Sequence, residues 1–547
     1  MSLFTEGIKC AAATSRHRLY FGENEKLASM SWSDVAATGQ RVTAALHAVG
    51  VRAGDRVCVL AAHANHVAPV AQGVWGARAA MTMLQQPTPQ ADLREWHTAT
   101  LRALRMLGAR VVIVGEPFHP AAATLAAAGH HVVAIPPAWP AAAATPLTPA
   151  EDDVALYQLT SGSTGDPKAV AISHANLYAN AEAMRVGAAA DTDADVMLSW
   201  LPLSHDMGLV GFLLTPMYLG IKTVYVPPTE FLRAPLNWVR LLSEQAATIT
   251  AAPNFAYSIV HRRLKAVNDG VYDLRRLRFA LCGAEPVDPN TMTEFARQAG
   301  RFGMRPQAVV AAYGLAEATL AVSFASLGES LQVDQLDAEE FERHHRAVPA
   351  ERTDAAAKEA VILGPPLPGM AVKVTDSDSA ELPARHLGEI LIRGAAVARR
   401  YATVEGDVDA IDTEGWLHTG DLGYLTERGE VVVCGRLKNV IIVAGRNIFP
   451  SELERIAESA DGVRRGAVVA FGTVLPDRRE EITVVAETVD RCDGETSREV
   501  RRAITRKVFS ATGLSPNVLL VDKGAIPKTP SGKIRHVAAK EKFAGIR

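Results

Sequence analysis

Short hydrophobic runs alternate with longer segments of mixed character along the first part of the chain. Arg56–Leu60 (RVCVL) and Arg110–Val114 (RVVIV) are rich in valine and lie near glycines, which is typical of buried strands. The segment between them contains many alanines and is helical in character. A further strand-like run, Val154–Leu159, follows. This alternation predicts an α/β sheet rather than a helical bundle.

The last part of the chain, from about Lys438, has the pattern of a small α+β domain. Strands are predicted at Val440–Val443, Gly466–Gly472 and Ile482–Glu487, and a helix at Pro450–Ser459. A longer helix is expected from about Ser497, with Thr496 and Glu499 as a capping-box pattern, Val500, Ala503, Ile504 and Val508 as its apolar stripe, and Gly513 as its stop. We therefore expect a large multi-subdomain α/β lobe over residues 1–437 and a small α+β domain over residues 438–547.

Composition and charge exclude several classes of protein. The chain has 547 residues, more than one hydrophobic core usually organises, and a formal net charge of −3 that does not support nucleic-acid binding. Its five cysteines are scattered without a CxxC pair, so a disulfide framework or zinc site is not expected and a reducing cytoplasm fits best. The N-terminus lacks the apolar region of a secretory signal. The longest apolar run, Leu209–Ile221, is interrupted by Thr215 and Pro216 and is too short to span a bilayer.

The most informative loop is Thr160–Lys168 (TSGSTGDPK), which follows the strand-like run ending at Leu159. Its two glycines allow a tight turn, and its hydroxyls, backbone N–H groups and lysine ammonium can all bind phosphate oxygens. The spacing differs from that of a Walker A loop. For an isolated loop of this composition a solvated turn is the preferred interpretation, but this loop follows a buried strand and is flanked by further motifs, which favours phosphate binding.

The loop resembles the phosphate loop of the adenylate-forming superfamily, which includes acyl-CoA synthetases, luciferases, peptide-synthetase adenylation domains and fatty acyl-AMP ligases. The resemblance covers nearly the whole chain, because further motifs follow in the family's order. It implies ATP-dependent activation of a carboxylic acid as an acyl adenylate. The implied ATP-binding residues of the loop are Thr160, Ser161, Gly162, Ser163, Thr164, Gly165 and Lys168, with Thr164 also at Mg²⁺.

Two further motifs resemble the parts of the family's site that hold adenine and the metal. Cys282–Pro286 (CGAEP) resembles a segment whose backbone lies along adenine, although alone it would be a strand followed by a proline turn. In Tyr313–Thr319 (YGLAEAT), the resemblance implies that Tyr313 stacks on adenine and Glu317 holds Mg²⁺, roles that suit a flat ring and a carboxylate. Many relatives have threonine in place of Ala316. The implied cofactor-binding residues are Gly283, Ala284, Glu285, Tyr313, Gly314 and Glu317.

Three motifs towards the C-terminus resemble the ribose, hinge and catalytic segments of the family. By this resemblance Asp421, in Thr-Gly-Asp, accepts the ribose hydroxyls. Gly435–Asn439 (GRLKN) resembles the hinge, so Arg436 would contact ribose or phosphate and Lys438 would be the pivot of a mobile small domain. Pro527–Arg535 (PKTPSGKIR) resembles the C-terminal catalytic loop. Its Lys533 would bridge the attacking carboxylate and the α-phosphate, where negative charge develops.

Trp200–Gly208 (WLPLSHDMG) resembles the motif at the acyl pocket, in the form found in fatty acyl-AMP ligases. Those ligases usually have tyrosine at the position of Ser204. By resemblance His205 is a catalytic residue that orients substrate, although a histidine beside an apolar run is as often a core residue. Leu209–Leu219 is compatible with an acyl tunnel and with plain core, because periodicity does not separate the two.

Two features favour the fatty acyl-AMP ligase branch over CoA ligases. Gly445–Pro450 (GRNIFP) resembles that branch's loop after the hinge. Phe324–Val348 is an acidic stretch that resembles the insertion which, in these ligases, restrains the small domain and disfavours CoA; an ordinary surface excursion is the alternative. The resemblance thus implies a long-chain fatty acid–AMP ligase that passes the acyl group to the phosphopantetheine thiol of an acyl carrier protein.

The alternatives differ in acceptor or in class. An acyl-CoA synthetase would share the first half-reaction. A non-catalytic nucleotide-binding scaffold is disfavoured because Lys533 and Glu317 are both present. ATP and Mg²⁺ are the expected cofactors, and the sequence does not predict the acyl chain length, the carrier or the oligomeric state.

Overall fold

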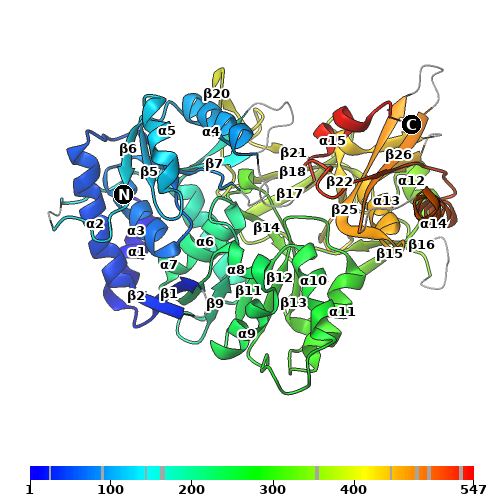
Figure 1. Cartoon of the computed structure of the whole chain (residues 1–547), viewed down its shortest axis with the longest axis horizontal. Coiled ribbons are helices and arrows are strands. Elements are labelled where there is room, and N and C mark those ends of the chain that lie inside the picture. Colours follow the sequence, from blue (N-terminus) through cyan, green and yellow to red (C-terminus); the bar gives the residue numbers. More distant parts are fainter. Residues whose placement is uncertain are drawn as a thin grey trace. The chain divides into compact units, whose positions relative to one another are not determined.

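The structure, a computed structural model, divides the chain into two compact units (Figure 1). It describes residues 1–23, 26–87, 92–141, 144–160, 167–351, 357–443, 446–474, 480–489, 494–528 and 534–546. The first unit comprises Met1–Leu331, Gly364–Ala371 and Ile392–Leu417, and the second comprises Gln332–Leu363, Val372–Leu391 and His418–Arg547. The domain boundary expected between residues 437 and 438 lies at a predicted hinge. The division into these two units does not test that hinge, so the boundary stays a prediction.

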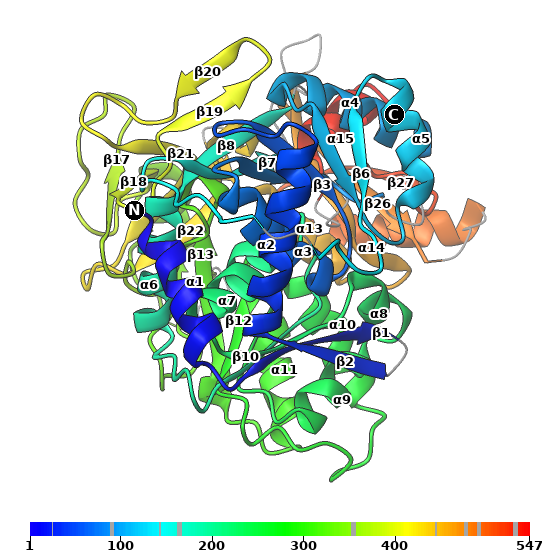
Figure 2. The ribbon, with the colours of Figure 1, turned by 90° about the vertical axis from the view of Figure 1, so that its left-hand side faces the viewer.

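One eight-stranded sheet of the first unit has the order β14-β13-β12-β11-β9-β10-β1-β2. Its strands are β1 (Arg18–Glu23), β2 (Lys26–Ser31), β9 (Val196–Ser199), β10 (Lys222–Tyr225), β11 (Ile249–Ala252), β12 (Phe279–Cys282), β13 (Val309–Gly314) and β14 (Ala321–Phe324). The neighbours from β13 to β1 pair in parallel, whereas β14 and β2 are antiparallel at the edges. Figure 2 shows the β1–β2 hairpin beside strands from much later in the chain. The parallel strands therefore present their carboxyl ends along one edge.

The second eight-stranded sheet has the order β20-β19-β8-β7-β4-β3-β5-β6. Its strands are β3 (Arg56–Leu60), β4 (Ala80–Met83), β5 (Val111–Val114), β6 (His131–Ala134), β7 (Val154–Thr160), β8 (Lys168–Ser173), β19 (Arg400–Thr403) and β20 (Gly406–Asp409). The three strands predicted in this region are confirmed to within one residue at each end. Every residue of β4 and β5 is buried, which explains the unbroken hydrophobic run of β5.

Small residues allow two long helices of the first unit to pack closely. A capping box of Ser31 and Asp34 begins α2, and its Thr43 hydroxyl donates to the Gly73 carbonyl of α3 at 3.1 Å. A Cβ at Gly73 would lie 2.4 Å from Val42, so no larger residue fits there without movement. The helices of this unit are α1 (Leu3–Thr14), α2 (Trp32–Ala48), α3 (Ala64–Gly76), α4 (Leu93–Leu107), α5 (Ala122–Ala127), α6 (His174–Gly187), α7 (Thr215–Leu219), α8 (Pro228–Arg233), α9 (Leu236–Glu244), α10 (Asn254–Leu264), α11 (Pro289–Gly300), the π-helix η2 (Met207–Leu214), and the short turns η1 (His119–Ala121), η3 (Pro306–Ala308) and η4 (Ala316–Ala318).

The second unit is a mixture of small sheets and helices, which confirms the expected α/β class with a smaller α+β part. Its sheets are β15-β16, β17-β18-β21-β22, β23-β24 and β25-β26-β27. The strands that lie wholly or mostly in this unit are β15 (Val333–Asp337), β16 (Ala357–Val361), β17 (Met370–Thr375), β18 (Gly388–Gly394), β21 (Leu417–Leu425), β22 (Val431–Arg436), β23 (Ile441–Val443), β24 (Arg446–Ile448), β25 (Val463–Val474), β26 (Glu480–Thr488) and β27 (Asn517–Val521). The helices are α12 (Ala338–His344), η5 (Leu437–Asn439), α13 (Pro450–Glu458), α14 (Gly494–Thr512) and α15 (His536–Phe543).

The long helix of this unit differs from its prediction at the N-terminus. It begins at Gly494, so Thr496 lies inside the helix and its predicted capping role is wrong. Glu495 in the first turn favours the earlier start, because a carboxylate is stabilised beside the exposed N–H groups of a helix. The rest of the prediction is confirmed: the stripe of Val500, Ile504 and Val508 is buried, and Gly513 has the left-handed φ of +70° that ends a helix.

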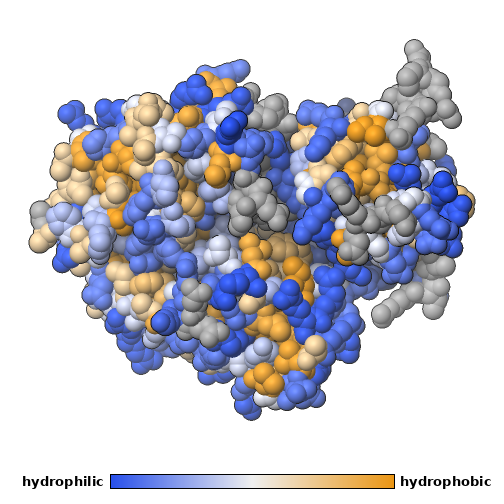
Figure 3. Space-filling view, viewed as in Figure 1, coloured by the Kyte–Doolittle hydropathy of each residue, from blue (hydrophilic) through white to orange (hydrophobic). Residues whose placement is uncertain are grey.

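The apolar run Leu209–Ile221 forms most of η2 and α7 and is packed in the main core of the first unit. On the face drawn in Figure 3, hydrophobic residues occur in separate groups among hydrophilic ones. Across the described ranges, we find no helix with the length and apolar character needed to cross a bilayer.

The acidic stretch Phe324–Val348 is more than an exposed excursion. Its later part forms β15 and α12, and two of its carboxylates, Asp334 and Glu342, are buried. Asp334 accepts hydrogen bonds from Arg385 at 2.9 Å and from the Tyr424 hydroxyl at 2.7 Å. A buried carboxylate needs such partners because burial removes its hydration.

Glu342 joins α12 to two other elements of the second unit. Its carboxylate lies 2.5 Å from Lys358 Nζ on β16 and 2.5 Å from Arg446 Nε on β24. Lys358 also contacts Glu452 on α13 at 2.5 Å. The Glu342 side chain is 3% exposed, so solvent hardly screens these contacts. Within the second unit, the stretch is thus held to the loop after the predicted hinge by a buried ion network.

We expect Glu342→Gln to destabilise the second unit by about 3 kcal/mol, because it leaves two largely enclosed cations with less compensating charge. Glu339→Gln is the matched control, since that side chain is 78% exposed and its pair with Arg343 is 3.9 Å long. The control should cost less than about 0.5 kcal/mol. Native-state hydrogen exchange of peptides from β15, α12 and β24 would measure both effects. Equal protection in the two variants would contradict a stabilising role for the network.

Candidate active site

Three of the predicted motifs of the first unit follow the carboxyl ends of parallel strands in one sheet. Trp200 follows β9, Gly283 follows β12, and the turn with Glu317 follows β13. The start of α10 follows β11, which lies between β9 and β12 in the sheet. Open α/β sheets bind ligands at this edge, because loops diverge there and leave space between them. The sheet order therefore brings together segments that are far apart in the sequence.

The turn after β13 is fixed by buried hydrogen bonds. Thr319 has a φ of +69°, which is uncommon for a β-branched residue, and its hydroxyl donates to the Ala396 carbonyl at 2.7 Å. The amide of Asn180, on α6, bonds both the N–H and the carbonyl of Ala321, at 3.0 and 2.8 Å. A Cβ at Gly314 would lie 2.1 Å from the Leu320 carbonyl oxygen, so this position requires glycine. The turn thus gives Glu317 a defined position.

Glu317 lies beside a lysine and a tyrosine from other segments of the first unit. Its Oε1 accepts a hydrogen bond of 3.0 Å from the Tyr401 hydroxyl and lies 3.8 Å from Lys168 Nζ. The same Nζ lies 3.6 Å from the centroid of the Tyr401 ring. The predicted metal carboxylate and the predicted phosphate-loop lysine are therefore neighbours.

The adenine-side segment is held by the side chain of Glu285. This carboxylate accepts a hydrogen bond of 2.6 Å from the Phe255 N–H in the first turn of α10, where unpaired N–H groups attract negative charge. Ala284 has a φ of +67°, and a Cβ at Gly283 would lie 3.2 Å from the Ala312 carbonyl oxygen. Glu285 therefore fixes the loop through its side chain. The contact of this backbone with adenine stays a prediction, as does the stacking of the buried Tyr313.

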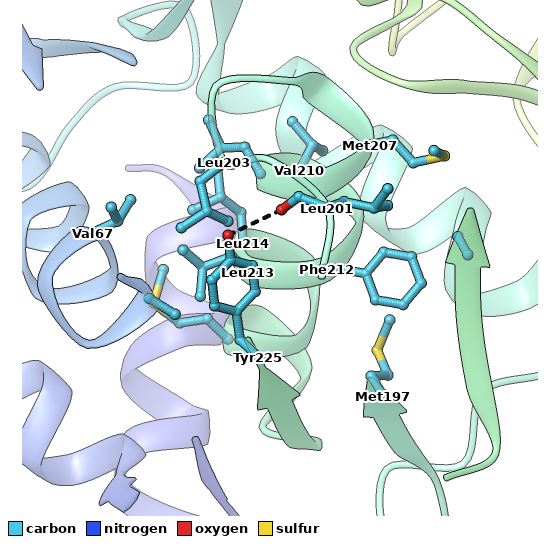
Figure 4. Close-up of a cluster of buried hydrophobic side chains, with 14 of the residues drawn as sticks. Val67, Met197, Leu201, Leu203, Met207, Val210, Phe212, Leu213, Leu214 and Tyr225 are labelled. Atoms are coloured by element: carbon cyan, nitrogen blue, oxygen red, sulfur yellow. Dashed lines mark hydrogen bonds between the residues drawn. The ribbon is translucent and has the colours of Figure 1, made fainter. Parts of the chain in front are cut away.

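The acyl motif is surrounded by aromatic and aliphatic side chains. The Trp200 and Phe231 rings stack with centroids 3.9 Å apart. Figure 4 shows Tyr225, whose hydroxyl donates to the Leu201 carbonyl at 3.0 Å, and the π-helix η2, from which Phe212 and Leu213 project to different sides. All residues of η2 are buried. π-Helical turns are rare and often occur at functional sites, because they displace side chains from the regular helical positions. Whether η2 lines an acyl tunnel stays a prediction.

His205 is half-buried and has a carboxylate partner. Its Nδ1 lies 2.6 Å from Asp206 Oδ1, which fixes the orientation of the imidazole ring. The carbonyl of the neighbouring Ser204 accepts a hydrogen bond of 3.0 Å from the buried Gln158 amide on β7. The strand that precedes the phosphate loop is therefore bonded to the acyl motif. The substrate-orienting role of His205 stays a prediction.

In the second unit, the structure pairs Asp421 with Arg436. They lie opposite each other on β21 and β22, and Arg436 Nε is 2.7 Å from Asp421 Oδ1. The Asp421 N–H donates to the Thr419 hydroxyl at 3.0 Å. Lys438 lies in the exposed turn η5 directly after β22. The β21–β22 strand pair thus carries Asp421, predicted to bind ribose, and Arg436. Lys438, the predicted hinge residue, lies in the turn that follows this pair.

Several predicted residues lie outside the described residues: Ser161, Gly162, Ser163, Thr164, Gly165, Gly445 and Lys533. Their flanking segments are described. Thr160 and Lys168 face each other at the ends of the antiparallel strands β7 and β8. Lys528 and Ile534 form an isolated antiparallel bridge on either side of the C-terminal segment. The assigned roles of the undescribed residues remain predictions.

Two residues that position the site were missed by sequence reasoning. Tyr401 lies on β19, a strand that joins β8 in the sheet, with Tyr401 opposite Val170. Asn180 lies within α6 and is fully buried. A buried asparagine in a helix is a weak signal that its amide bonds another segment. No local pattern marks Tyr401, because its partners come from distant segments.

The carboxylate of Glu317 in the first unit suits a metal ion that would bind together with nucleotide phosphates. Within the described part of the chain, no group of three or more His, Cys, Asp or Glu side chains is arranged to hold a metal ion. Glu317 instead offers one carboxylate, with its side chain 16% exposed. Mg²⁺ commonly binds through one or two carboxylates together with substrate phosphates. The donor set therefore suits magnesium bound to a nucleotide rather than a protein-only site.

Known proteins resemble this chain over most of its length. The sequence profile described as AMP-binding enzyme matches residues 9–402. The protein named Putative ligase Rv1013, from Mycobacterium tuberculosis, is 44% identical over 537 residues, 98% of each chain. Putative acyl-CoA synthetase of Caulobacter vibrioides is 36% identical over 77% of this chain and 73% of that protein. Medium-chain-fatty-acid–[acyl-carrier-protein] ligase JamA of Moorena producens is 34% identical over 72% of this chain and 68% of that protein.

The fold also matches a solved structure. A chain from structural and functional studies of fatty acyl-adenylate ligases from E. coli and L. pneumophila superposes with a TM-score of 0.90, at 28% identity, over 99% of this chain and 98% of that one. The sequence profile, the relatives and the matching fold all indicate the same family as the motifs that lie along one edge of the sheet. This chain belongs to the AMP-binding enzyme family and is an adenylate-forming ligase.

Proposed function

We propose that this chain activates a long-chain fatty acid with ATP, releases pyrophosphate, and transfers the acyl group to the phosphopantetheine thiol of an acyl carrier protein. The observation that carries the proposal is the shared edge of the β9–β13 sheet. Along it the buried acyl motif, the adenine-side segment and the Glu317 turn follow one another. An apolar acid, a nucleotide and a metal-bound phosphate would therefore meet there.

The first half-reaction needs positioning and charge neutralisation more than covalent help. A carboxylate is already a nucleophile at neutral pH, so one of its oxygens attacks the α-phosphorus while the bond to pyrophosphate breaks. Glu317 and Thr164 would hold Mg²⁺, which when bound supplies positive charge at the phosphate oxygens. Lys168 adds charge from the loop, and Lys533 would stabilise the transition state from the C-terminal loop. In the second half-reaction the thiol sulfur attacks the acyl carbon, and AMP leaves.

The apolar surroundings of the acyl motif support a fatty acid as the substrate. Trp200, Phe231 and the side chains of η2 make the surroundings of this motif hydrophobic, which would favour a hydrocarbon chain over a polar acid. The solved structure that superposes on this chain comes from a study of fatty acyl-adenylate ligases, which supports the same substrate class. An amino-acid substrate is disfavoured, because the sequence has no FDxS-like motif that would anchor its ammonium group.

The acyl carrier protein is the proposed acceptor, and CoA is the alternative. JamA is named for transfer to a carrier protein and supports the first, whereas the Caulobacter relative is named as an acyl-CoA synthetase and supports the second. The network of Glu342 with Arg446 favours the carrier protein, because it ties the acidic stretch to the loop after the hinge, as expected of the insertion that disfavours CoA. The scattered cysteines favour a cytoplasmic location.

An acid panel assayed by pyrophosphate release tests the activation step. We expect laurate and longer fatty acids to react, and Lys533→Ala to lower the rate by about 100-fold or more, because it removes a cation aimed at the transition state. ATP binding, measured by calorimetry, should persist in this variant. Lys523→Ala, at an exposed lysine of the same domain, is the control and should react like the parent protein. Undiminished adenylation by Lys533→Ala would remove its catalytic assignment.

The acceptor is tested by offering laurate and ATP with either CoA or a holo acyl carrier protein. We expect thioester formation with the carrier protein and at most a slow reaction with CoA. Mass spectrometry of the carrier protein and of CoA would detect both products. Prompt formation of lauroyl-CoA would instead identify the chain as an acyl-CoA synthetase, without affecting the activation step.

A further inference from the structure

Tyr401 contacts both charged groups at the Glu317 turn through different parts of its side chain. Its hydroxyl donates to Glu317 Oε1 at 3.0 Å, while its ring lies 3.6 Å from Lys168 Nζ. Among the described residues, none donates a hydrogen bond to the second carboxylate oxygen, Oε2. Tyr401 therefore donates a hydrogen bond to one carboxylate oxygen of Glu317, and the face of its ring contacts the Lys168 ammonium.

The position of Tyr401 is fixed by the backbone on both sides of it. Tyr401 and Ala402 pair with Val170 and Ala169 on β8, the strand that begins at Lys168. The Ala398 N–H, just before β19, donates to the Glu317 carbonyl at 2.8 Å. Tyr401 is thus tied by main-chain hydrogen bonds to the two segments whose side chains it contacts. Its geometry follows from the sheet and does not depend on a flexible loop.

The ring changes what Lys168 can do. Its Nζ is 3.8 Å from Glu317 Oε1, which is longer than a direct charge-assisted hydrogen bond. An ammonium over the face of a tyrosine is attracted to that face, so part of its charge is already compensated. Without the ring, a direct ion pair with Glu317 would form more easily. Such a pair would compete with a metal ion for the same carboxylate.

We propose that Tyr401 is a positioning residue for the nucleotide: its hydroxyl orients Glu317 so that Oε2 faces the metal of MgATP, and its ring holds Lys168 towards the phosphates and out of a direct ion pair. This inference rests on the proposed adenylation, in which Glu317 binds Mg²⁺. It adds a specific role for a residue that touches neither reacting atom. Residues that orient a metal ligand commonly change metal affinity by 10- to 100-fold when they are replaced.

Two substitutions separate the two parts of the side chain. Tyr401→Phe removes the hydroxyl and keeps the ring, so it should raise the Mg²⁺ concentration for half-maximal pyrophosphate release by about 10-fold. Calorimetric binding of ATP without metal, in EDTA, should be unchanged in this variant. Tyr401→Leu removes the ring as well and should also weaken ATP binding in EDTA, because Lys168 is no longer held. Tyr20→Phe is the control, since Lys222 Nζ lies 5.1 Å from that ring in a similar pair away from the site.

A double-mutant cycle tests the restraint on Lys168. If the ring acts through the lysine, the effects of Tyr401→Leu and Lys168→Met on ATP binding in EDTA should be less than additive, because the second change removes what the first disturbs. Additive effects would overturn this part of the proposal. Thermal melting identifies variants that fail to fold, and if Tyr401→Leu is one of them, Tyr401→Phe alone decides the proposal through its Mg²⁺ dependence.

The proposal is overturned if folded Tyr401→Phe has the Mg²⁺ dependence of the parent protein. It is also overturned if the variant loses ATP affinity equally with and without Mg²⁺, because that pattern indicates a merely structural role. Failure of the parent protein to activate any acid would contradict the proposed function instead. The calorimetric comparison of ATP with MgATP would still test Tyr401 in that case, so the two failures can be told apart.

Discussion

The proposed site depends on how one carboxylate is held by a tyrosine hydroxyl and a lysine ammonium. Glu317 lies in a partly buried turn between the Tyr401 hydroxyl and the Lys168 ammonium. A carboxylate in such a place must be oriented, because a wrong orientation would either bury an unpaired charge or neutralise it with the lysine. The surrounding backbone provides this order: Asn180 and Thr319 hold the turn with buried hydrogen bonds. The proposed binding of MgATP in the first unit would depend on that constraint.

The second unit uses the same physical principle for a structural purpose. Glu342 and Asp334 are buried carboxylates from one acidic stretch, and each has a cationic partner from another element. Asp421 is also buried, yet its partner Arg436 is about half exposed, with 48% of its side chain accessible. An arginine that is accessible on one side can bind a further anion. The ion pairs that stabilise this unit are thus more enclosed than the pair predicted to meet the ribose.

Much of the fold could be predicted because the relevant patterns are local. The valine-rich runs that became β3 and β5 are short, largely buried and close to glycines, so composition alone identifies them. The start of α14 was wrong by several residues because a helix end depends on small differences in capping energy. The acidic stretch was predicted from its composition, but burial of Glu342 depends on Lys358 and Arg446, which no local pattern connects.

In the candidate site, too, some features could be predicted from the sequence and others could not. Resemblance predicted Lys168, Glu285, Glu317, Asp421 and Arg436, and the structure places two pairs of charged groups together. It did not predict that the Glu285 carboxylate bonds the first turn of α10, or that Tyr401 contacts both Lys168 and Glu317. Both contacts depend on the order of strands in a sheet, and strand order is a property of the whole chain.

The most direct measurement follows the oxygen atoms of the acid. Laurate labelled with ¹⁸O in its carboxyl group is incubated with ATP and the protein, and hydroxylamine then releases the acyl group by attack at the acyl carbon. If the carboxylate attacks the α-phosphorus, the released AMP carries one ¹⁸O and the pyrophosphate carries none, as mass spectrometry would show. AMP without the label, or the label in pyrophosphate or inorganic phosphate, would contradict the account.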